Sequence, residues 1–139
     1  MTDSSPPVQD LLFAPRAAVE AAQERNFAEM IDLVFERHPY YRALFAAKGL
    51  GREDLRTLGD LARLPLTDKA DYMREPQRFV LNGEGLPEEM RTVWDIMYTT
   101  GSTSGQPTPF VSTSYDFYNI LALQRNMLRL RGVTRADSI

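Results

Sequence analysis

The residues of this 139-residue chain whose types and spacing could do chemistry lie in one segment, residues 98–108. Between Thr99 and Gly105 it holds five hydroxyl side chains and two glycines. Glycines allow backbone turns that aim several N–H groups into one concavity, and such concavities bind anions. Serine and threonine hydroxyls donate to phosphate oxygens or coordinate a phosphate-bound metal ion. The segment therefore fits a triphosphate better than a carboxylate or a sugar. The candidate phosphate ligands are Thr99, Thr100, Gly101, Ser102, Thr103, Ser104 and Gly105.

Two familiar phosphate-binding patterns do not match this segment. The P-loop requires Lys directly after its second glycine, whereas Gln106 follows Gly105 here. The dinucleotide fingerprint G-x-G-x-x-G is also absent. A flexible Ser/Thr/Gly linker is the alternative interpretation. The flanking residues favour a binding loop, because an apolar run precedes the segment and Pro107-Thr108-Pro109-Phe110 leads on into a helical pattern.

The elements that must position this loop are a strand on each side and a long helix. Val93 to Tyr98 is a short, mostly apolar run, which predicts a buried strand. Residues 110–112 predict a second strand. Ser114 is the expected N-cap of a helix over residues 115–131, and Gly132 is expected to end it. The apolar residues of this helix are numerous enough for burial on more than one side.

The first half of the chain predicts helices joined by short loops. A helix is expected from Arg16 to His38, because Pro39 disfavours the helical conformation before it. A second helix is expected over residues 40–48, closed by Gly49 and Gly51. The apolar stripe of the first helix consists of Phe27, Met30, Ile31, Val34 and Phe35.

Shorter elements are expected between residues 55 and 92. Residues 55–63 predict one or two helical turns, and Leu64-Pro65-Leu66 is expected to be extended. Thr67 is the expected N-cap of a short helix that reaches Arg74, with the Asp68 carboxylate at its positive end. Residues 82–92 predict a loop.

Composition excludes several classes of function. The formal net charge of −3 and the pI near 5.2 argue against nucleic-acid binding. The absence of cysteine excludes a disulfide scaffold, a thiolate metal site and a cysteine nucleophile, and a single histidine disfavours His-based metal clusters. The N-terminus has no apolar signal region, and no apolar run is long enough to span a bilayer. We therefore expect a cytoplasmic protein without membrane association.

Residues 98–108 resemble the phosphate-binding signature of the adenylate-forming superfamily, which includes acyl-CoA synthetases, luciferases and peptide-synthetase adenylation domains. That signature has an aromatic residue or hydrophobe, a Thr/Ser-Gly-rich core and then Gly-x-Pro, as in Gly105-Gln106-Pro107 here. The segment is most similar to the phenylacetate-CoA ligase branch, which commonly has Thr where other members have Lys after the proline, as Thr108 here. Two residues depart from the pattern: Ser102 stands where the family usually has Gly, and Gln106 replaces a frequent Lys.

The resemblance extends over roughly residues 27–139. The segments that carry it are His38-Pro39-Tyr40-Tyr41-Arg42, Lys48-Gly49, Leu64-Pro65-Leu66-Thr67-Asp68-Lys69, Asp116 at the start of the long helix, and Arg131-Gly132-Val133. It implies an α/β fold class, with a helical N-terminal subdomain over 16–92 and the first strand-loop-strand-helix of an AMP-binding domain over 93–139, truncated. The N-terminus over residues 1–15 is expected to be partly disordered, because Pro6, Pro7 and Pro15 break regular structure.

The resemblance also implies the reaction and its participants. A carboxylate, aryl or related, would be activated by ATP as an acyl-adenylate and transferred to CoA, with Mg²⁺ beside the phosphates. The family carries its adenine contacts, acidic ribose contact, acyl pocket and catalytic lysine downstream of this region. We therefore expect an N-terminal fragment with no catalytic residue of its own, inactive alone. A homodimer is a further expectation.

Single residues outside the loop have structural interpretations. His38 is expected to be a charge partner at a helix end and not a base. Tyr40 and Tyr41 are expected to pack, and Trp94 to lie in the core. The alternative function is a non-catalytic helical module that pairs with a partner or with itself while the loop stays idle. A kinase-like or NTPase site is a weaker hypothesis, because the P-loop lysine is absent.

Overall fold

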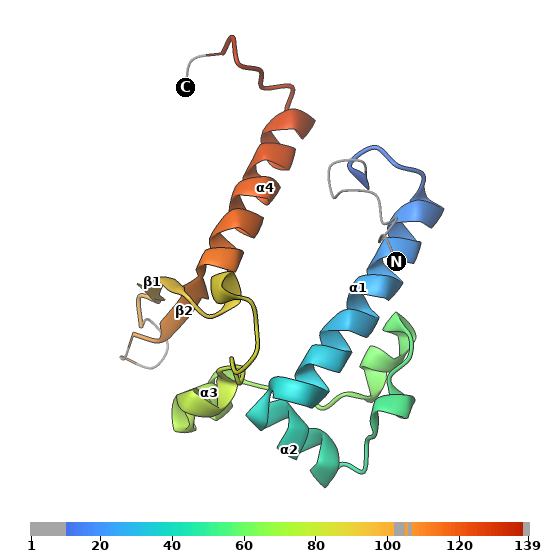
Figure 1. Ribbon diagram of the computed structural model, residues 1–139, viewed down its shortest axis with the longest axis vertical. Helices are drawn as coiled ribbons and strands as arrows, with labels where there is room; N and C mark the ends of the chain where they lie inside the picture. Colours follow the sequence, from blue (N-terminus) through green and yellow to red (C-terminus); the bar gives the residue numbers. More distant parts are fainter. Residues whose placement is uncertain (1–10, 102–104, 106, 138–139) are drawn as a thin grey trace. The chain divides into compact units, whose positions relative to one another are not determined.

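A computed structural model of the chain describes residues 11–101, 105 and 107–137. The chain divides into two compact units that meet at the Asn82–Gly83 junction, here called the first and the second unit. It is rich in helix and, within the described residues, has a single two-stranded antiparallel sheet, which is compatible with an α/β class (Figure 1). The expected disorder of residues 1–15 stays a prediction, because residues 1–10 lie outside the described part. Residues 11–14 form a turn in which the Ala14 N–H donates to the Leu11 carbonyl at 3.2 Å.

Two helices build the core of the first unit, α1 (Arg16–Arg37) and α2 (Pro39–Ala47), and both were predicted within a residue or so. Phe27 and Ile31 of α1 are buried against Phe45 of α2 and Leu55 of the following segment. Burial of side chains of this size contributes about 1.5–3 kcal/mol each. Met30 was expected in the same stripe, but it lies at the stripe's edge and is about half exposed.

His38 forms the corner between these two helices. Its N–H donates to the Val34 carbonyl at 3.0 Å at the end of α1, and its Nδ1 accepts from the Tyr41 N–H at 3.3 Å at the start of α2. The residue is 9% exposed, and this burial lowers the pKa of the imidazole below its usual value. The prediction that His38 is a charge partner at a helix end is therefore wrong. An imidazole whose Nδ1 accepts a hydrogen bond carries no proton on that nitrogen, and near-complete burial favours the same neutral form.

An aromatic cluster holds the His38 corner to the end of the first unit. Tyr40 stacks on Phe79 with ring centroids 4.1 Å apart, and Tyr41 lies 4.5 Å from the His38 ring. Phe79 ends a single-turn 3₁₀ helix, η4 (Pro76–Phe79). The packing role expected for Tyr40 and Tyr41 is confirmed.

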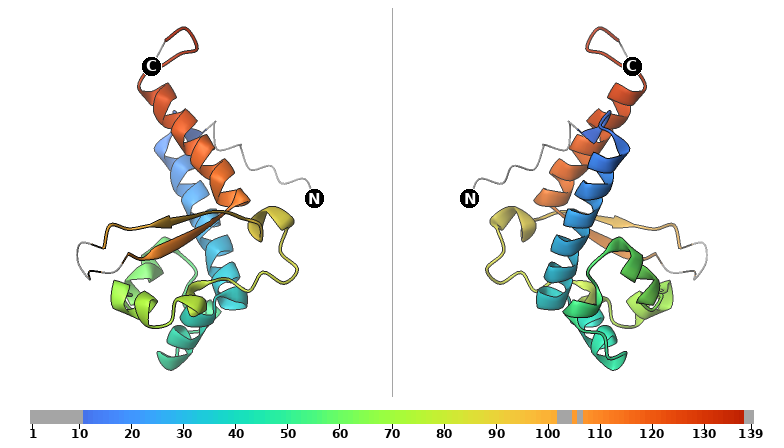
Figure 2. Two further views of the ribbon diagram at one scale, coloured as in Figure 1. Left: turned by 90° about the vertical axis from the view of Figure 1, so that its left-hand side faces the viewer. Right: turned by 90° about the vertical axis from the view of Figure 1, so that its right-hand side faces the viewer.

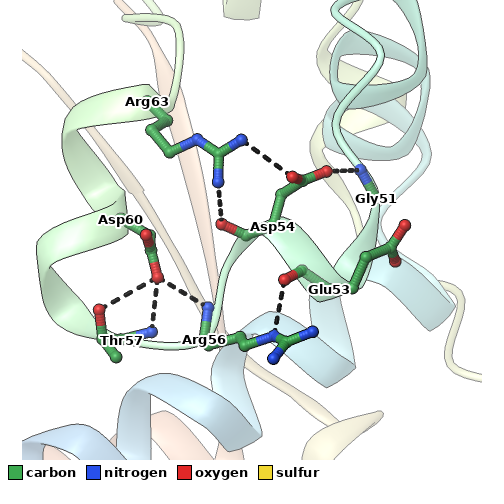
Figure 3. Close-up of polar contacts among 7 residues, drawn as sticks. All are labelled: Gly51, Glu53, Asp54, Arg56, Thr57, Asp60 and Arg63. Carbon is green, nitrogen blue, oxygen red and sulfur yellow. Dashed lines mark hydrogen bonds and ion pairs between the residues drawn. The ribbon is translucent and has the colours of Figure 1, made fainter.

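Carboxylates organise the loops between α2 and α3 (Lys69–Arg74), where two further 3₁₀ helices lie, η2 (Arg52–Asp54) and η3 (Leu58–Arg63). Asp54 accepts from the Gly51 N–H and from Arg63 Nη2, each at 2.9 Å (Figure 3). Asp60 accepts from the N–H of Thr57 at 2.9 Å and of Arg56 at 3.0 Å. Backbone hydrogen bonds, from Gly51 and Thr57 respectively, are the main cause that lowers the pKa of these two carboxyls.

Three local expectations for this region need correction. Asp68, and not Thr67, caps α3, because its carboxylate accepts from the Asp71 N–H at 2.9 Å. Of the two glycines expected to close α2, Gly49 alone is left-handed (φ 65°), whereas Gly51 is extended. Leu55 does not begin a helix and is fully buried instead.

The second unit consists of a short 3₁₀ helix η5 (Glu88–Met90), two strands and a long helix. Strand β1 (Val93–Tyr98) pairs antiparallel with β2 (Pro109–Thr113) in a register that places Ile96 opposite Val111 and Tyr98 opposite Pro109. Helix α4 (Ser114–Leu130) follows β2 directly and ends where Gly132 takes φ 72° (Figure 2). Both predicted strands and the predicted helix are therefore present.

Burial in the second unit differs from the prediction. All six residues of β1 are exposed, and Trp94, expected in the core, is 60% exposed although its ring lies 4.5 Å from Phe117 of α4. The physical reason is that the described residues of this unit provide a hairpin, one helix and one 3₁₀ turn, too few elements to enclose a sheet. The N-cap of α4 is Thr113, and not Ser114 as expected.

Candidate functional site

The hydroxyl-rich segment connects β1 to β2, so it forms the end of a β-hairpin. Its two ends are joined at Thr99 and Thr108: the Thr99 N–H donates to the Thr108 carbonyl, and the Thr108 N–H donates to the Thr99 hydroxyl oxygen, each at 3.0 Å. Thr108 is 1% exposed. These bonds continue the antiparallel pairing beyond Tyr98 and Pro109, with a side chain in place of one backbone acceptor. They define a fixed neck for the loop.

Two glycines inside the neck take the left-handed conformation. Gly101 has φ 70° and Gly105 has φ 69°, and the Gly105 N–H donates to the Gly101 carbonyl at 2.7 Å. A Cβ atom added at Gly105 would meet nothing within 4 Å. A side chain there is therefore opposed by the backbone conformation and not by crowding.

The structure thus places four of the seven predicted phosphate ligands, Thr99, Thr100, Gly101 and Gly105, in one hairpin loop. The other three, Ser102, Thr103 and Ser104, lie outside the described residues, as does Gln106. Thr99 already uses its N–H and a hydroxyl lone pair at the neck, and Gly105 uses its N–H on Gly101. In this conformation the N–H groups of Thr99 and Gly105 stabilise the loop itself, and the hydroxyl hydrogen of Thr99 remains available as a donor.

No carboxylate or imidazole cluster suited to a metal ion occurs among the described residues. The carboxylate closest in sequence on the strand side, Asp95, accepts from the Ile96 N–H at 2.8 Å. At the start of α4, Asp116 accepts from both the N–H and the hydroxyl of Thr113 at 2.8 Å. Both carboxylates therefore have local structural roles.

The second unit also contains an open groove of about 510 Å³ that the sequence interpretation missed. Its walls come from both strands of the hairpin and from α4. The lining residues are Met97, Phe110, Val111, Ser112, Asp116, Asn119, Ile120 and Leu123. The surplus of apolar residues in α4 was the available signal, but it did not show which strand residues would face them.

Helices of the kind that cross membranes are not found in the described part of the chain: none is both long and apolar enough.

Comparison with known proteins confirms the resemblance stated from the loop. The chain is 32% identical to a phenylacetate-coenzyme A ligase of Thermus thermophilus over 102 residues, which is 73% of this chain and 22% of that protein. It is 27% identical to phenylacetate-coenzyme A ligases of Aromatoleum evansii and Escherichia coli, over 91% and 87% of this chain and 27% and 26% of theirs. The chain thus spans about a quarter of the length of these relatives. No protein-family model matches it.

Proposed function

We propose that this chain, similar over most of its length to phenylacetate-coenzyme A ligases, supplies the triphosphate-binding loop of an ATP-dependent carboxylate-CoA ligase. The observation that carries the proposal is the hairpin loop with left-handed glycines at positions 101 and 105 inside a hydrogen-bonded neck. Left-handed glycines redirect successive peptide N–H groups, and such backbone forms anion-binding concavities.

The proposed architecture assigns residues 16–92 to a helical N-terminal subdomain and residues 93–139 to the start of the AMP-binding domain. The order strand, loop, strand, helix from β1 to α4 supports the second assignment. The hairpin gives the loop a rigid base, because backbone pairing fixes its register and the two hydrogen bonds between Thr99 and Thr108 fix its neck.

The proposed reaction has two steps. A carboxylate oxygen of an aryl or related acid attacks the α-phosphorus of ATP, and the bond to pyrophosphate breaks. The CoA thiol then attacks the acyl carbon, its proton is lost, and AMP leaves. In the first step the loop would hold the β- and γ-phosphates and stabilise the charge that develops on the leaving pyrophosphate. Donors already in place at that moment lower the barrier more than donors that must reorganise.

The residues present fit a phosphate chain better than a directly bound metal ion. Gly105 has open space around it, the neck threonines fix the loop ends, and the described residues hold no cluster of metal-binding side chains. Loop hydroxyls would help to hold a magnesium ion bound together with the phosphates, and the ion would supply neutralisation of the phosphate charge. We assign no catalytic residue to this chain. Adenine, acyl and CoA contacts and the catalytic lysine are proposed for the rest of such a ligase.

The experiment that tests this function is a titration of the isotope-labelled chain with magnesium tripolyphosphate, followed by amide NMR. We expect saturable shifts at Thr100, Gly101 and Gly105. Gly49 and Gly85 are internal controls, since they share the left-handed conformation but lie outside the loop. Shifts of equal size at all four glycines, or none at Gly101 and Gly105, would contradict the proposal.

The alternative of a non-catalytic helical module is not favoured by the comparisons, because all three relatives described above are named as ligases.

A further inference from the structure

One asparagine of the chain is followed directly by glycine, at Asn82-Gly83. Asparagine is a thermally labile residue, because the backbone nitrogen of the next residue can attack its side-chain amide carbon. Glycine favours this attack, since it places no Cβ beside that nitrogen and lets the backbone turn toward the side chain. The other asparagines of the sequence precede bulky side chains; they are Asn26, Asn119 and Asn126.

The backbone around Asn82 is open to such an attack. Residues 81–83 belong to no helix or strand, and Asn82 is exposed. The Gly83 N–H has no hydrogen-bond acceptor among the described residues. The other asparagines lie inside α1 and α4, where the N–H of the following residue is held in the helix ladder and is released only by local opening. Structure and sequence therefore single out the same position.

Arg37, the last residue of α1, contacts the Asn82 backbone at two points. The Asn82 N–H donates to the Arg37 carbonyl at 2.8 Å, and Arg37 Nη1 donates to the Asn82 carbonyl at 3.3 Å. That carbonyl belongs to the same peptide group as the Gly83 nitrogen. A cation beside it stabilises the negative charge that the peptide group gains when its nitrogen loses a proton. The guanidinium thus favours formation of the attacking nitrogen at this peptide.

We propose that Asn82 is a site of spontaneous deamidation, in which Arg37 promotes the attack by the Gly83 nitrogen and directs the product toward isoaspartate. The deprotonated Gly83 nitrogen forms a bond to the Asn82 Cγ, the bond from Cγ to the side-chain nitrogen breaks, and ammonia leaves with the proton. Water then opens the cyclic imide. Addition of water at the former backbone carbonyl breaks its bond to the Gly83 nitrogen and leaves the chain linked through Cγ, which is isoaspartate. Addition at Cγ gives aspartate.

The contact with Arg37 bears on both the direction of ring opening and its result. The guanidinium stabilises the oxyanion that forms when water adds at the carbonyl it contacts, and this favours isoaspartate. The product replaces a neutral amide with a carboxylate next to Arg37 and lengthens the main chain by a methylene. Because Asn82 is the last residue of the first unit and no loop residue takes part, the modification is independent of the proposed phosphate site.

The test is storage of the purified chain in neutral buffer, followed by digestion with trypsin. Residues 79–91 form a tryptic peptide in which Asn82 is the single asparagine, and residues 92–125 form another in which Asn119 is the single asparagine. An endoprotease that cuts before aspartate but not before isoaspartate distinguishes the two products. Conversion at Asn82 should be at least about tenfold faster than at Asn119, because opening of α4 adds to the barrier there.

Variants separate the effect of Arg37 from that of the dipeptide. Arg37→Gln should slow conversion by about threefold or more and lower the share of isoaspartate. Arg42→Gln is the matched control, because Arg42 Nη1 also donates to a backbone carbonyl at 3.3 Å, that of Glu36, and it should react like the wild type. Gly83→Ala should slow conversion by about tenfold or more. In urea, which abolishes the fixed contact, the wild type and Arg37→Gln should react at the same rate.

Two results would overturn the proposal. One is conversion at Asn82 that is no faster than at Asn119 in the folded chain. The other is a wild-type rate and a wild-type product ratio in Arg37→Gln that circular dichroism shows to be folded. If Arg37→Gln loses its helix content, the folded wild type in high salt takes its place. Salt screens the exposed guanidinium, so the share of isoaspartate should fall, and an unchanged share would contradict the role of Arg37.

Discussion

At the scale of single residues, the loop combines two kinds of structural constraint. Gly101 and Gly105 supply a backbone conformation that other residues adopt at a cost on the order of 1–3 kcal/mol. Thr99 was predicted as a phosphate ligand, but its N–H and hydroxyl oxygen close the neck with Thr108. Hydroxyl composition alone could not predict the neck, because it does not show which partners the N–H and the hydroxyl oxygen of Thr99 have.

His38 leads to a prediction about pH. Burial lowers the pKa of its imidazole below the ordinary value of 6.5, so the folded chain favours the neutral ring. The unfolded chain then binds more protons, and the stability that the neutral ring contributes is complete above pH 6.5 and lost as pH falls through the folded pKa. Between about pH 7 and pH 5 the urea midpoint of the first unit should fall further in the wild type than in His38→Asn.

Asparagine is the informative replacement, since it also caps a helix N-terminus but does not titrate. Asp54 and Asp60, whose lowered pKa values favour the folded state above their ordinary value of 3.8, lose their contribution only at lower pH and do so equally in both proteins. Parallel pH profiles of the two proteins would show that His38 does not act as a neutral cap.

At the scale of elements, local patterns predicted the helices and strands well, and missed what depends on neighbours. Pro39 and the spacing of Phe27 and Ile31 are local features, and α1 and α2 follow them. The exposure of β1 depends on the elements around it, which its own sequence does not contain. The N-caps of α3 and α4 were each predicted one residue away from the observed cap, although the sequence contains a signal for the right residue.

That signal is an acidic residue three positions after the cap. Thr113 has Asp116 and Asp68 has Asp71 at that spacing, whereas Ser114 and Thr67 are followed there by Phe117 and Ala70. Reciprocal bonding between the cap and its third successor decides between adjacent candidates.

The capping geometry predicts unequal effects of two neighbouring substitutions. Thr113→Ala removes the hydroxyl that accepts from the Asp116 N–H at 3.3 Å and donates to its carboxylate at 2.8 Å. It should weaken the first turn of α4 by about 1 kcal/mol, which hydrogen exchange would record as roughly fivefold faster exchange of the first-turn amides. Ser114→Ala should change these rates by less than about twofold. Equal effects would mean that the cap is misassigned.

At the scale of the whole molecule, the two units differ in how complete they are. The first has a core in which α1, α2 and Leu55 enclose one another. The second presents the loop and an extensive apolar surface. The chain spans about a quarter of the length of the relatives described above, so the activity that their names state is a proposal for this protein.

The isolated chain should therefore fail to catalyse the first half-reaction. Pyrophosphate release, measured with ATP, magnesium and a panel of aryl carboxylic acids, should stay at the background rate, because the adenine contacts and the catalytic lysine are proposed for the rest of such a ligase. The Thermus thermophilus ligase under the same conditions is the positive control. Turnover by the purified chain that clearly exceeds background would contradict this division of roles.

The most direct test of the central claim compares the affinity for magnesium tripolyphosphate of the wild type, Gly105→Val and Gly132→Val. Both glycines are left-handed, with φ 69° and 72°, and neither has an atom within 4 Å of an added Cβ, so the two substitutions carry the same kind of backbone strain. Gly105→Val should weaken binding about tenfold or more, because a distorted loop loses several N–H donors together. Gly132→Val, at the end of α4, should bind like the wild type. Equal affinity of Gly105→Val and the wild type would mean that residues 99–105 are a connection between two strands and not a phosphate site.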